Sequence, residues 1–331
     1  MQTLLLNPDD VDDNAAMAEI IVAVEEAFAA YEAGRVQMPA KSYIDLPEYN
    51  GDFRSMPAYM DAGEWDAAGI KWVNVHTDNP EEYDLPTVLG TMIYSDPRTA
   101  FPLAVMDGTT LTRKRTGAAA AVATDHLAVA DARSLGIVGA GVQSYTQLEA
   151  ISTVRDIERV VVADRREAAI EAFVERFGDE FDVRGGTIAE AASCDVLSTV
   201  TPVKSPIVNA GDLGDHTHIN AMGADAPGKN ELALDVVAAA KLVIDDYEQC
   251  THSGEINVPW SEGALTDADL YGELGEIVAG KLDGRTSGDG VTVFDSTGLA
   301  IQDVAAAHVV YERASEDGEG TPYGLVDTRV R

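Results

Sequence analysis

Hydrophobic residues follow a helical period near the N-terminus and a strand-like period after it. Apolar side chains recur every three or four positions over residues 13–33, which predicts an amphipathic helix ended by Gly34. Alternating apolar and polar positions then predict strands over residues 41–47, 53–60, 69–77, 87–95 and 101–107. The Asn50-Gly51 dipeptide predicts a two-residue hairpin turn that pairs residue 41 with 60 and residue 47 with 54. Consecutive strands joined by short turns indicate an antiparallel sheet in an α+β domain.

The pattern changes at residue 116, where short apolar strands begin to alternate with helices. The predicted strands cover residues 135–141, 158–164, 194–201, 216–224, 241–246 and 291–298. The predicted helices cover residues 116–128, 142–153, 166–178 and 231–240. Such alternation is typical of βαβ units and a parallel sheet, which makes the fold class α/β.

Two domains are expected from this change of pattern. A Rossmann-type dinucleotide-binding domain would cover residues 116–298. A substrate-binding and dimerisation domain would cover residues 1–115. A last helix over residues 299–314 is expected to pack back on that domain, so that residues 299–331 complete it.

The charge balance limits the partners that the protein can have. The 331 residues include 57 acidic and 23 basic ones, a formal net charge of −34. Such a charge repels nucleic acid and anionic lipid, so neither is an expected partner. The acids are spread along the whole chain, which we interpret as adaptation of a halophilic protein to a salt-rich cytoplasm. The alternative is an ordinary acidic protein.

Other sequence features also favour a cytoplasmic protein. No stretch approaches the ~20 apolar residues that span a bilayer. The first residues lack the basic start of a signal peptide. Cys194 and Cys250 lie far apart and form neither a disulfide framework nor a zinc motif.

A glycine-containing turn predicts the dinucleotide site. Gly139 and Gly141 follow a predicted strand and open a helix, where a pyrophosphate can approach the backbone, although Ser144 replaces the third glycine of the usual pattern. Asp164 ends the next strand, where an acid binds the ribose hydroxyl of NAD. Arg165 and its arginine neighbour leave NADP open, because a guanidinium can accept a 2′-phosphate.

Four basic residues are candidates to bind an anionic substrate. Lys71 shares a strand face with apolar neighbours, which indicates either a functional lysine or one at the sheet edge. Lys41 and Arg54 are expected on one face of the predicted hairpin. Arg115 is expected at the N-terminus of a helix, where a cation is unfavourable unless an anion is bound.

Asp225 is the candidate general base. It follows a predicted parallel strand in the loop GADAPGKNEL, and ligands of parallel sheets bind beyond the carboxyl ends of strands. A turn or capping aspartate is the alternative. His216 and His218 alternate in the same strand, but no third ligand stands at suitable spacing, so we predict no metal.

Taken together, these motifs resemble the ornithine cyclodeaminase/mu-crystallin family, and within it the archaeal-type alanine dehydrogenases. The resemblance runs over roughly residues 35–310 and rests on MPAKSYIDLP, FRSMPAY, GIKWVNVHTDNP, RTGAAAAVA, GIVGAGVQS, INAMGADAPGKNEL and VTVFDSTGLAIQD. It implies that Lys71 and Arg115 hold the substrate carboxylate and that Asp225 is the catalytic aspartate. It also implies dinucleotide contacts at Thr87, Arg115, Gly141, Val142, Gln143, Asp164, Thr201, Lys229 and Ser296. A homodimer built through the non-Rossmann domain is expected as well.

One departure from the family separates its possible reactions. Arg54 stands where ornithine cyclodeaminases carry an acid that receives the terminal amine of the substrate. The resemblance therefore favours NAD-dependent oxidative deamination of L-alanine to pyruvate and ammonia, with Lys41 or Lys71 assisting proton transfer. Ornithine cyclodeaminase, ketimine or pyrroline-2-carboxylate reductase, and a non-catalytic mu-crystallin-like binding protein are the alternatives.

Overall fold

The computed structural model describes residues 1–329 and divides into two compact units. Unit 1 comprises Met1–Arg115 and Leu299–Arg331, and unit 2 comprises Thr116–Gly298. Within the described part of the chain, no helix is both long and apolar enough to cross a membrane.

Unit 1 is built on an eight-stranded sheet. Its strands are β1 (Thr3–Leu6), β2 (Val36–Gln37), β3 (Ser42–Leu46), β4 (Gly51–Asp61), β5 (Asp66–His76), β6 (Val88–Ser95), β7 (Pro102–Asp107) and β16 (Thr321–Tyr323). The order is β16-β1-β7-β6-β5-β4-β2, with β3 also paired to β4. The pairs are antiparallel except β1 with β7, so the sheet is mixed. The sequence pattern did not predict three of these strands, β1, β2 and β16.

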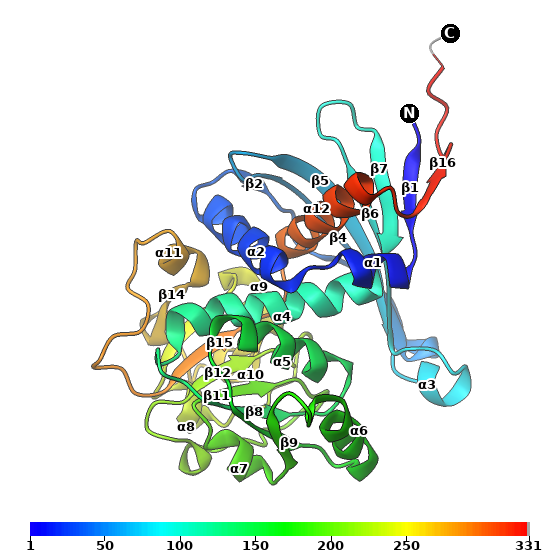
Figure 1. The fold of residues 1–331 in the computed structure, drawn as a ribbon. Coiled ribbons are helices and arrows are strands. Elements are labelled where there is room, and N and C mark those ends of the chain that lie inside the picture. Colours follow the sequence, from blue (N-terminus) through cyan, green and yellow to red (C-terminus); the bar gives the residue numbers. More distant parts are fainter. Residues whose placement is uncertain (330–331) are drawn as a thin grey trace. The chain divides into compact units, whose positions relative to one another are not determined.

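Helices cover one face of this sheet. The helices of unit 1 are α1 (Pro8–Asn14), α2 (Met17–Glu32), α3 (Asn79–Glu82), the first part of α4 (Gly108–Leu127) and α12 (Ala300–Asp317). α12 packs on β4, β5 and β6, and α2 lies beside α12 (Figure 1). Under them, the sheet register aligns a buried row across five strands, made of Leu6, Met106, Met92, Lys71 and Met56. Lys71 is the polar member of this row.

The predicted hairpin register is wrong. Residues 47–49 form a 3-10 helix, and Asn50 ends that helix in the left-handed region with φ 46°. The connection is therefore longer than two residues, and Tyr43 pairs with Arg54, a shift of four positions from the predicted pairing. The shift is an even number of residues, so each side chain keeps its predicted face of the sheet.

The predicted start of the long helix is also wrong. α4 begins at Gly108, because the carboxylate of Asp107 accepts hydrogen bonds from the N–H groups of Thr109 and Thr110 and so caps the first turn. Arg115 consequently lies inside the helix rather than at its N-terminus.

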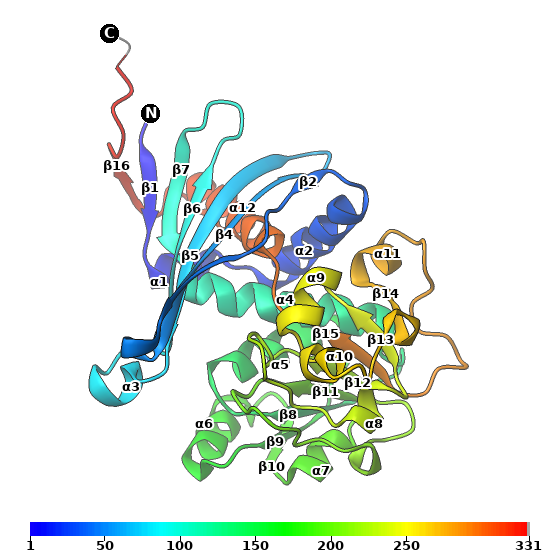
Figure 2. The same cartoon turned by 180° about the vertical axis from the view of Figure 1, so that it is seen from behind.

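Unit 2 is an open parallel sheet with helices on both faces (Figure 2). Its strands are β8 (Ser134–Val138), β9 (Arg159–Ala163), β10 (Asp182–Gly185), β11 (Val196–Thr199), β12 (His218–Ala221), β13 (Lys241–Ile244), β14 (Leu270–Glu273) and β15 (Thr292–Asp295). The order is β10-β9-β8-β11-β12-β15-β13-β14, and each adjacent pair is parallel. The chain reverses its direction of progress across the sheet between β8 and β11, which is where such folds bind ligands.

The helices of unit 2 enclose two apolar cores, one on each side of the sheet. These helices are the remainder of α4, followed by α5 (Val142–Val154), α6 (Glu167–Phe177), α7 (Ile188–Ala192), α8 (Leu234–Val237), α9 (Tyr247–Ser253), α10 (Asn257–Ser261) and α11 (Leu274–Val278). This Rossmann-type unit confirms the predicted α/β class. Two strands, β10 and β14, were not predicted, and the helix expected over residues 231–240 is limited to α8.

Candidate functional site

The turn between β8 and α5 has the form that a dinucleotide pyrophosphate requires. Gly139 has φ 103°, and a Cβ there would lie 2.9 Å from the carbonyl oxygen of Val200. A Cβ on Gly141 would meet no atom of the chain, so the fold itself does not require glycine at that position. Gly141 is the N-cap residue of α5, and no side chain caps this helix end, which leaves its first N–H groups for an anion. The residues present therefore fit the pyrophosphate.

Ser144 fits the third position of the glycine pattern. Its side chain is fully buried, and its hydroxyl donates a hydrogen bond of 2.6 Å to the carbonyl oxygen of Gly141. The hydroxyl is therefore satisfied inside the turn, and a small side chain still allows the helix to lie close to the strand.

Asp164 closes the turn from the end of β9. Its carboxylate accepts hydrogen bonds from the N–H groups of Ala140 and Arg166, both at 2.8 Å. Partial burial opposes ionisation, but these bonds and the guanidinium of Arg166 outweigh it and lower the pKa of Asp164. The carboxylate is thus held anionic beside the pyrophosphate turn, which suits ribose hydroxyls better than a 2′-phosphate. Arg165 lies exposed on the same loop.

Buried carboxylates also lie at the carboxyl ends of β13 and β15, beyond the place where the strand order reverses. They accept hydrogen bonds from the loops that follow. Asp245 accepts hydrogen bonds from the N–H groups of Thr297 and Gly298 and from the hydroxyl of Ser296. Asp295, at the end of β15, accepts from two N–H groups of the segment after α9, and burial raises its pKa to about 7. These bonds fix the loop that contains Ser296, one of the expected dinucleotide contacts.

The loop of Asp225 is fixed at its base in the same way. Glu231 accepts hydrogen bonds from the N–H groups of Thr201 and Gly223, and burial raises its pKa. On the loop itself, the ammonium of Lys229 donates to the carboxylate of Asp225 at 2.6 Å. The structure therefore brings Thr201, Asp225 and Lys229 to one group of loops at the carboxyl ends of β11 and β12.

Lys71 is the central residue of the candidate site in unit 1. Its side chain is 1% exposed, and its ammonium donates to Asp303 Oδ1 at 2.7 Å and to Thr112 Oγ1 at 3.1 Å. Burial lowers the pKa of Lys71 to about 7, against the opposing attraction of Asp303. Of the two alternatives for this residue, the structure excludes a lysine extended into solvent at the sheet edge.

Arg115 lies against the same carboxylate from α4. Its Nε donates to Asp303 Oδ1 at 3.1 Å, and its Nη1 donates to Gln302 Oε1 at 3.1 Å. The argument from a helix N-terminus fails for this residue. Lys71 and Arg115 both donate to Asp303 of α12.

Arg54 lies on the same sheet face but already has a counterion. Its guanidinium makes a two-point contact with the carboxylate of Asp52, at 2.8 Å from Nη2 and 3.1 Å from Nε, and lies over the ring of Tyr43. Lys41 precedes β3, close enough to Lys71 that its charge lowers the pKa of Lys71 further.

Thr87 and the two histidines make other contacts. Thr87 precedes β6 in unit 1, where its carbonyl oxygen accepts from the N–H of His76. His218 is fully buried between Thr292 and Asn220, and burial lowers its pKa to about 3. His216 contacts a backbone carbonyl. Among residues 1–329, no three histidine, cysteine or acidic side chains are grouped as metal ligands.

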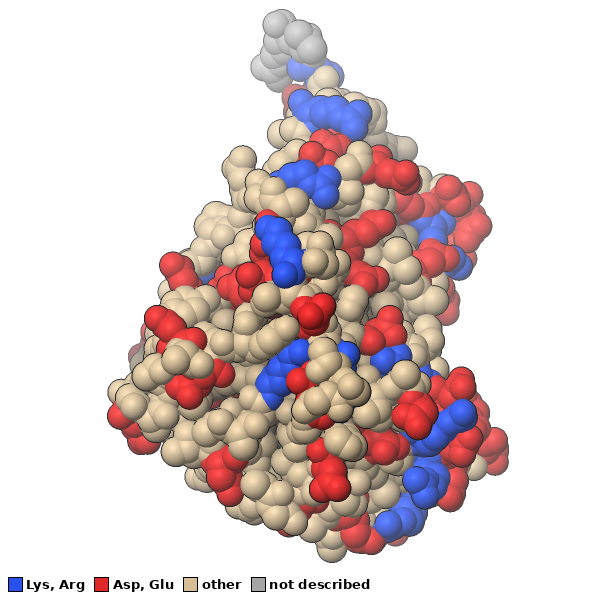
Figure 3. All heavy atoms as spheres, turned by 90° about the vertical axis from the view of Figure 1, so that its left-hand side faces the viewer, with Lys and Arg blue, Asp and Glu red and all other residues tan. Residues whose placement is uncertain are grey.

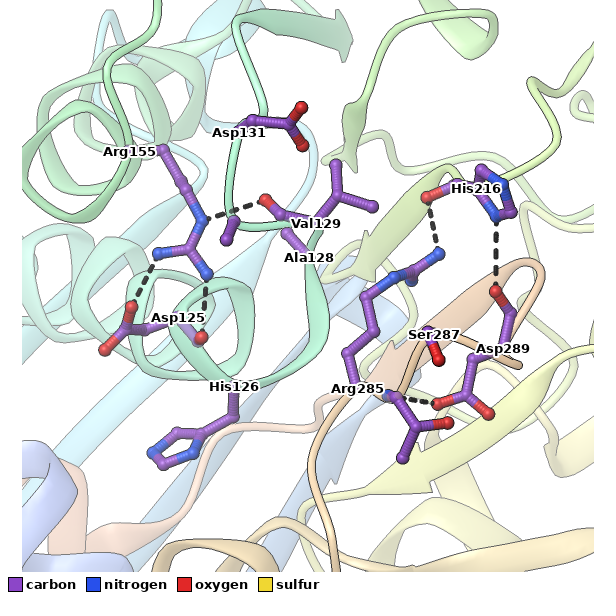
Figure 4. Close-up of a pocket in the computed structure, with 12 residues that line it drawn as sticks. Asp125, His126, Ala128, Val129, Asp131, Arg155, His216, Arg285, Ser287 and Asp289 are labelled. Atoms are coloured by element: carbon purple, nitrogen blue, oxygen red, sulfur yellow. Dashed lines mark hydrogen bonds and ion pairs between the residues drawn. The ribbon is translucent and has the colours of Figure 1, made fainter.

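One cavity of unit 2 lies away from the dinucleotide turn. Its volume is about 450 Å³, and Figure 4 shows it between the end of α4 and the loops before β12 and β15. Those are the amino ends of the strands, opposite to the dinucleotide turn. Arg155 and Arg285 line it, but both donate to backbone carbonyl groups, including those of Asp125 and Leu127 at the end of α4. They hold a helix end in place.

The surface agrees with the charge of the sequence. Figure 3 shows acidic side chains scattered over one face of the molecule, with basic ones between them, rather than a single basic patch.

Comparisons with known proteins agree with this fold and geometry. The model of the "Ornithine cyclodeaminase/mu-crystallin family" matches residues 1–318. The chain belongs to the ornithine cyclodeaminase/mu-crystallin family. An alanine dehydrogenase of Archaeoglobus fulgidus is 47% identical over 322 residues, which are 97% of this chain and 98% of that protein.

Solved structures of this family match both units. An archaeal alanine dehydrogenase dimer with bound NAD has a TM-score of 0.93 at 46% identity, and covers 98% of this chain and 100% of its own. The Δ1-pyrroline-2-carboxylate reductase of Thermococcus litoralis, in complex with NADH and L-proline, has a TM-score of 0.92 at 36% identity, with 96% and 99% covered.

Sequence reasoning missed Asp303 and Gln302. Both lie in the string VTVFDSTGLAIQD, which carries the family resemblance, but they were given no role. A signal was present, because Gln302 and Asp303 interrupt the apolar residues of the final helix near its start. Polar side chains at a buried helix end need hydrogen-bond or ionic partners. In a chain with few basic residues, the lysines and arginines already singled out were the candidates.

Proposed function

We propose that the protein is an NAD-dependent amino-acid dehydrogenase that converts L-alanine to pyruvate and ammonia. The observation that carries this proposal is the buried pair of cations, Lys71 and Arg115, in a chain of net charge −34. Such a pair fits a small carboxylate. The pyrophosphate turn and Asp164 support NAD as the cofactor, as do the dehydrogenase relatives.

Each unit contributes one part of the chemistry. In unit 1, Lys71 and Arg115 orient the substrate carboxylate, with Lys41 nearby. NAD, when bound, would accept the hydride from the substrate Cα, and loss of a proton from the substrate nitrogen would complete the imine. In unit 2, Asp225 positions or deprotonates the water that hydrolyses this imine, and Lys229 holds the carboxylate of Asp225 on its loop.

Arg54 and Asp52 favour alanine over ornithine. A cyclodeaminase needs a free carboxylate for the terminal ammonium of ornithine. Asp52 is already paired with Arg54 at 2.8 Å, and the guanidinium would repel a second cation beside it. A small apolar side chain makes no such demand.

The direct test is absorbance at 340 nm in high-salt buffer with NAD or NADP and L-alanine or L-ornithine. We expect NADH from NAD and L-alanine, and the reverse reaction with pyruvate and ammonium. Proline from ornithine without net NADH would instead assign a cyclodeaminase. Reduction of a cyclic imine alone would assign a pyrroline-2-carboxylate reductase, and nucleotide binding without any turnover a mu-crystallin-like role.

Asp225→Asn should lower kcat for L-alanine by about 10²–10⁴-fold, because the variant cannot accept the proton of the attacking water. NADH binding, measured by fluorescence titration, should change little. Asp235→Asn is the matched control, since Asp235 is an exposed acid of the same unit and should leave kcat unchanged. Equal kcat for Asp225→Asn and the wild type would remove Asp225 from the mechanism.

We further propose that a second copy of the chain covers the bare face of the sheet in unit 1. This face presents Ile44, Phe53, Trp72 and Ile93, with Phe53 and Trp72 stacked at a centroid distance of 5.2 Å. α2 and α12 lie on the opposite face (Figures 1 and 2). An apolar sheet face of this kind is typical of a protein interface, and the archaeal relative is described as a dimer.

Trp72→Asp should shift the protein from dimer to monomer in sedimentation velocity at high salt, because it places an unpaired charge in the interface. Val22→Asp is the matched control, since Val22 is an equally apolar, exposed residue on α2 and should leave the dimer intact. A wild-type monomer, or a Trp72→Asp variant that remains dimeric, would contradict this assignment.

A further inference from the structure

One carboxylate oxygen in unit 1 is shared by two cations from distant parts of the chain. Asp303 lies in the first turn of α12 and is completely buried. Its Oδ1 accepts from Lys71 Nζ of β5 at 2.7 Å and from Arg115 Nε of α4 at 3.1 Å. A single atom therefore sets the distance between the ammonium and the guanidinium.

Both cations keep donors for a further anion. Lys71 has three N–H donors, of which Asp303 and Thr112 take two. Arg115 has five, and it uses one on Asp303 and one on Gln302. Three N–H groups of the guanidinium, one on Nη1 and two on Nη2, therefore remain for a substrate carboxylate.

The local charge matches a monocarboxylate. Lys71 and Arg115 carry two positive charges against one negative charge on Asp303, and Gln302 is neutral. Arg54 on β4 is balanced by Asp52, and Lys41 adds one positive charge from the segment before β3. With Asp303 in place, the buried pair of cations has a net charge of +1, which one substrate carboxylate neutralises.

Loss of the Asp303 charge would change the state of Lys71. Burial, Arg115 and Lys41 all lower the pKa of Lys71, and Asp303 is the group that raises it. Without that carboxylate the lysine would lose its proton at a lower pH. A neutral lysine no longer attracts an anion.

Two buried polar atoms at the start of α12 lack the hydrogen bonds that a purely structural ion pair would be expected to have. Asp303 Oδ2 and Gln302 Nε2 are buried, and neither has a hydrogen-bond partner among the described residues. A buried polar atom without a partner lowers stability. A pair kept for stability alone would be expected to satisfy these atoms.

We propose that Asp303 is a positioning residue, which keeps Lys71 protonated and holds Lys71 and Arg115 at the spacing that grips the substrate carboxylate. Asp303 acts through the two cations. This inference rests on the proposed function, in that it assigns the carboxylate-binding role to Lys71 and Arg115.

The first test follows the titration of Lys71 without any substrate. Protein labelled with [ε-¹³C]lysine is titrated by NMR in high-salt buffer, and the Lys71 signal is assigned with Lys71→Met. We expect a wild-type midpoint near pH 7. Asp303→Asn, which keeps the size and removes the charge, should lower the midpoint by at least about one pH unit. An unchanged midpoint would overturn the proposal.

Gln302→Met is the matched control. It removes an equally buried neighbour that contacts Arg115 but not Lys71, so the midpoint of Lys71 should not move. An equal shift in both variants would show a general disturbance of α12 and would also overturn the proposal. Asp303→Glu keeps the charge and covers the case in which Asp303→Asn does not fold; its midpoint should stay close to that of the wild type.

The second test separates binding from chemistry. A protonated lysine attracts the carboxylate, so affinity should fall as the pH rises through the Lys71 midpoint. Asp303→Asn should raise the KM for L-alanine at pH 7 by about fivefold if the midpoint falls from pH 7 to pH 6, with a much smaller change in kcat. A lowered kcat with KM unchanged would contradict the proposal. If L-alanine is not a substrate, the NMR titration still tests Asp303, so the two failures are distinguishable.

Discussion

The site in unit 1 depends on the cost of burying positive charge. Lys71 lies in a row of buried methionines on the sheet, and Arg115 is buried on α4; at both positions an unpaired cation would be strongly disfavoured. Asp303, which lies far along the chain, accepts a hydrogen bond from each of the two cations with one oxygen atom and so offsets the cost of their burial. This carboxylate belongs to the segment after residue 298 that completes the first unit.

In unit 2 the buried ionisable groups are acids instead of bases, and they too need partners. Asp245, Asp295 and Glu231 are buried at the carboxyl edge of the parallel sheet, where each accepts backbone N–H groups from a loop. The loops beyond these strands carry Asp225 and Ser296. Buried acids thus fix the loops on which the expected cofactor contacts stand.

Much of the fold could be predicted because local signals agreed with it. The strand, turn and helix around Gly139 and Gly141, with Asp164 one strand later, form a continuous segment whose geometry follows from its own residues. The errors arose where distant contacts decide. The register of β3 depends on a 3-10 helix that the Asn50-Gly51 signal hid, and α4 starts eight residues early because Asp107 caps it. Asp303 was missed because its partners lie 188 and 232 positions away in sequence.

The most direct test of the account follows the hydrogen on the substrate Cα. The enzyme is incubated with NAD and L-alanine deuterated at Cα, and the mass of the reduced dinucleotide is measured. If unit 1 holds the amino acid by its carboxylate and the hydride leaves Cα, the deuterium appears in the reduced dinucleotide together with pyruvate. Reduced dinucleotide without deuterium, or no reduction of NAD at all, would contradict the account.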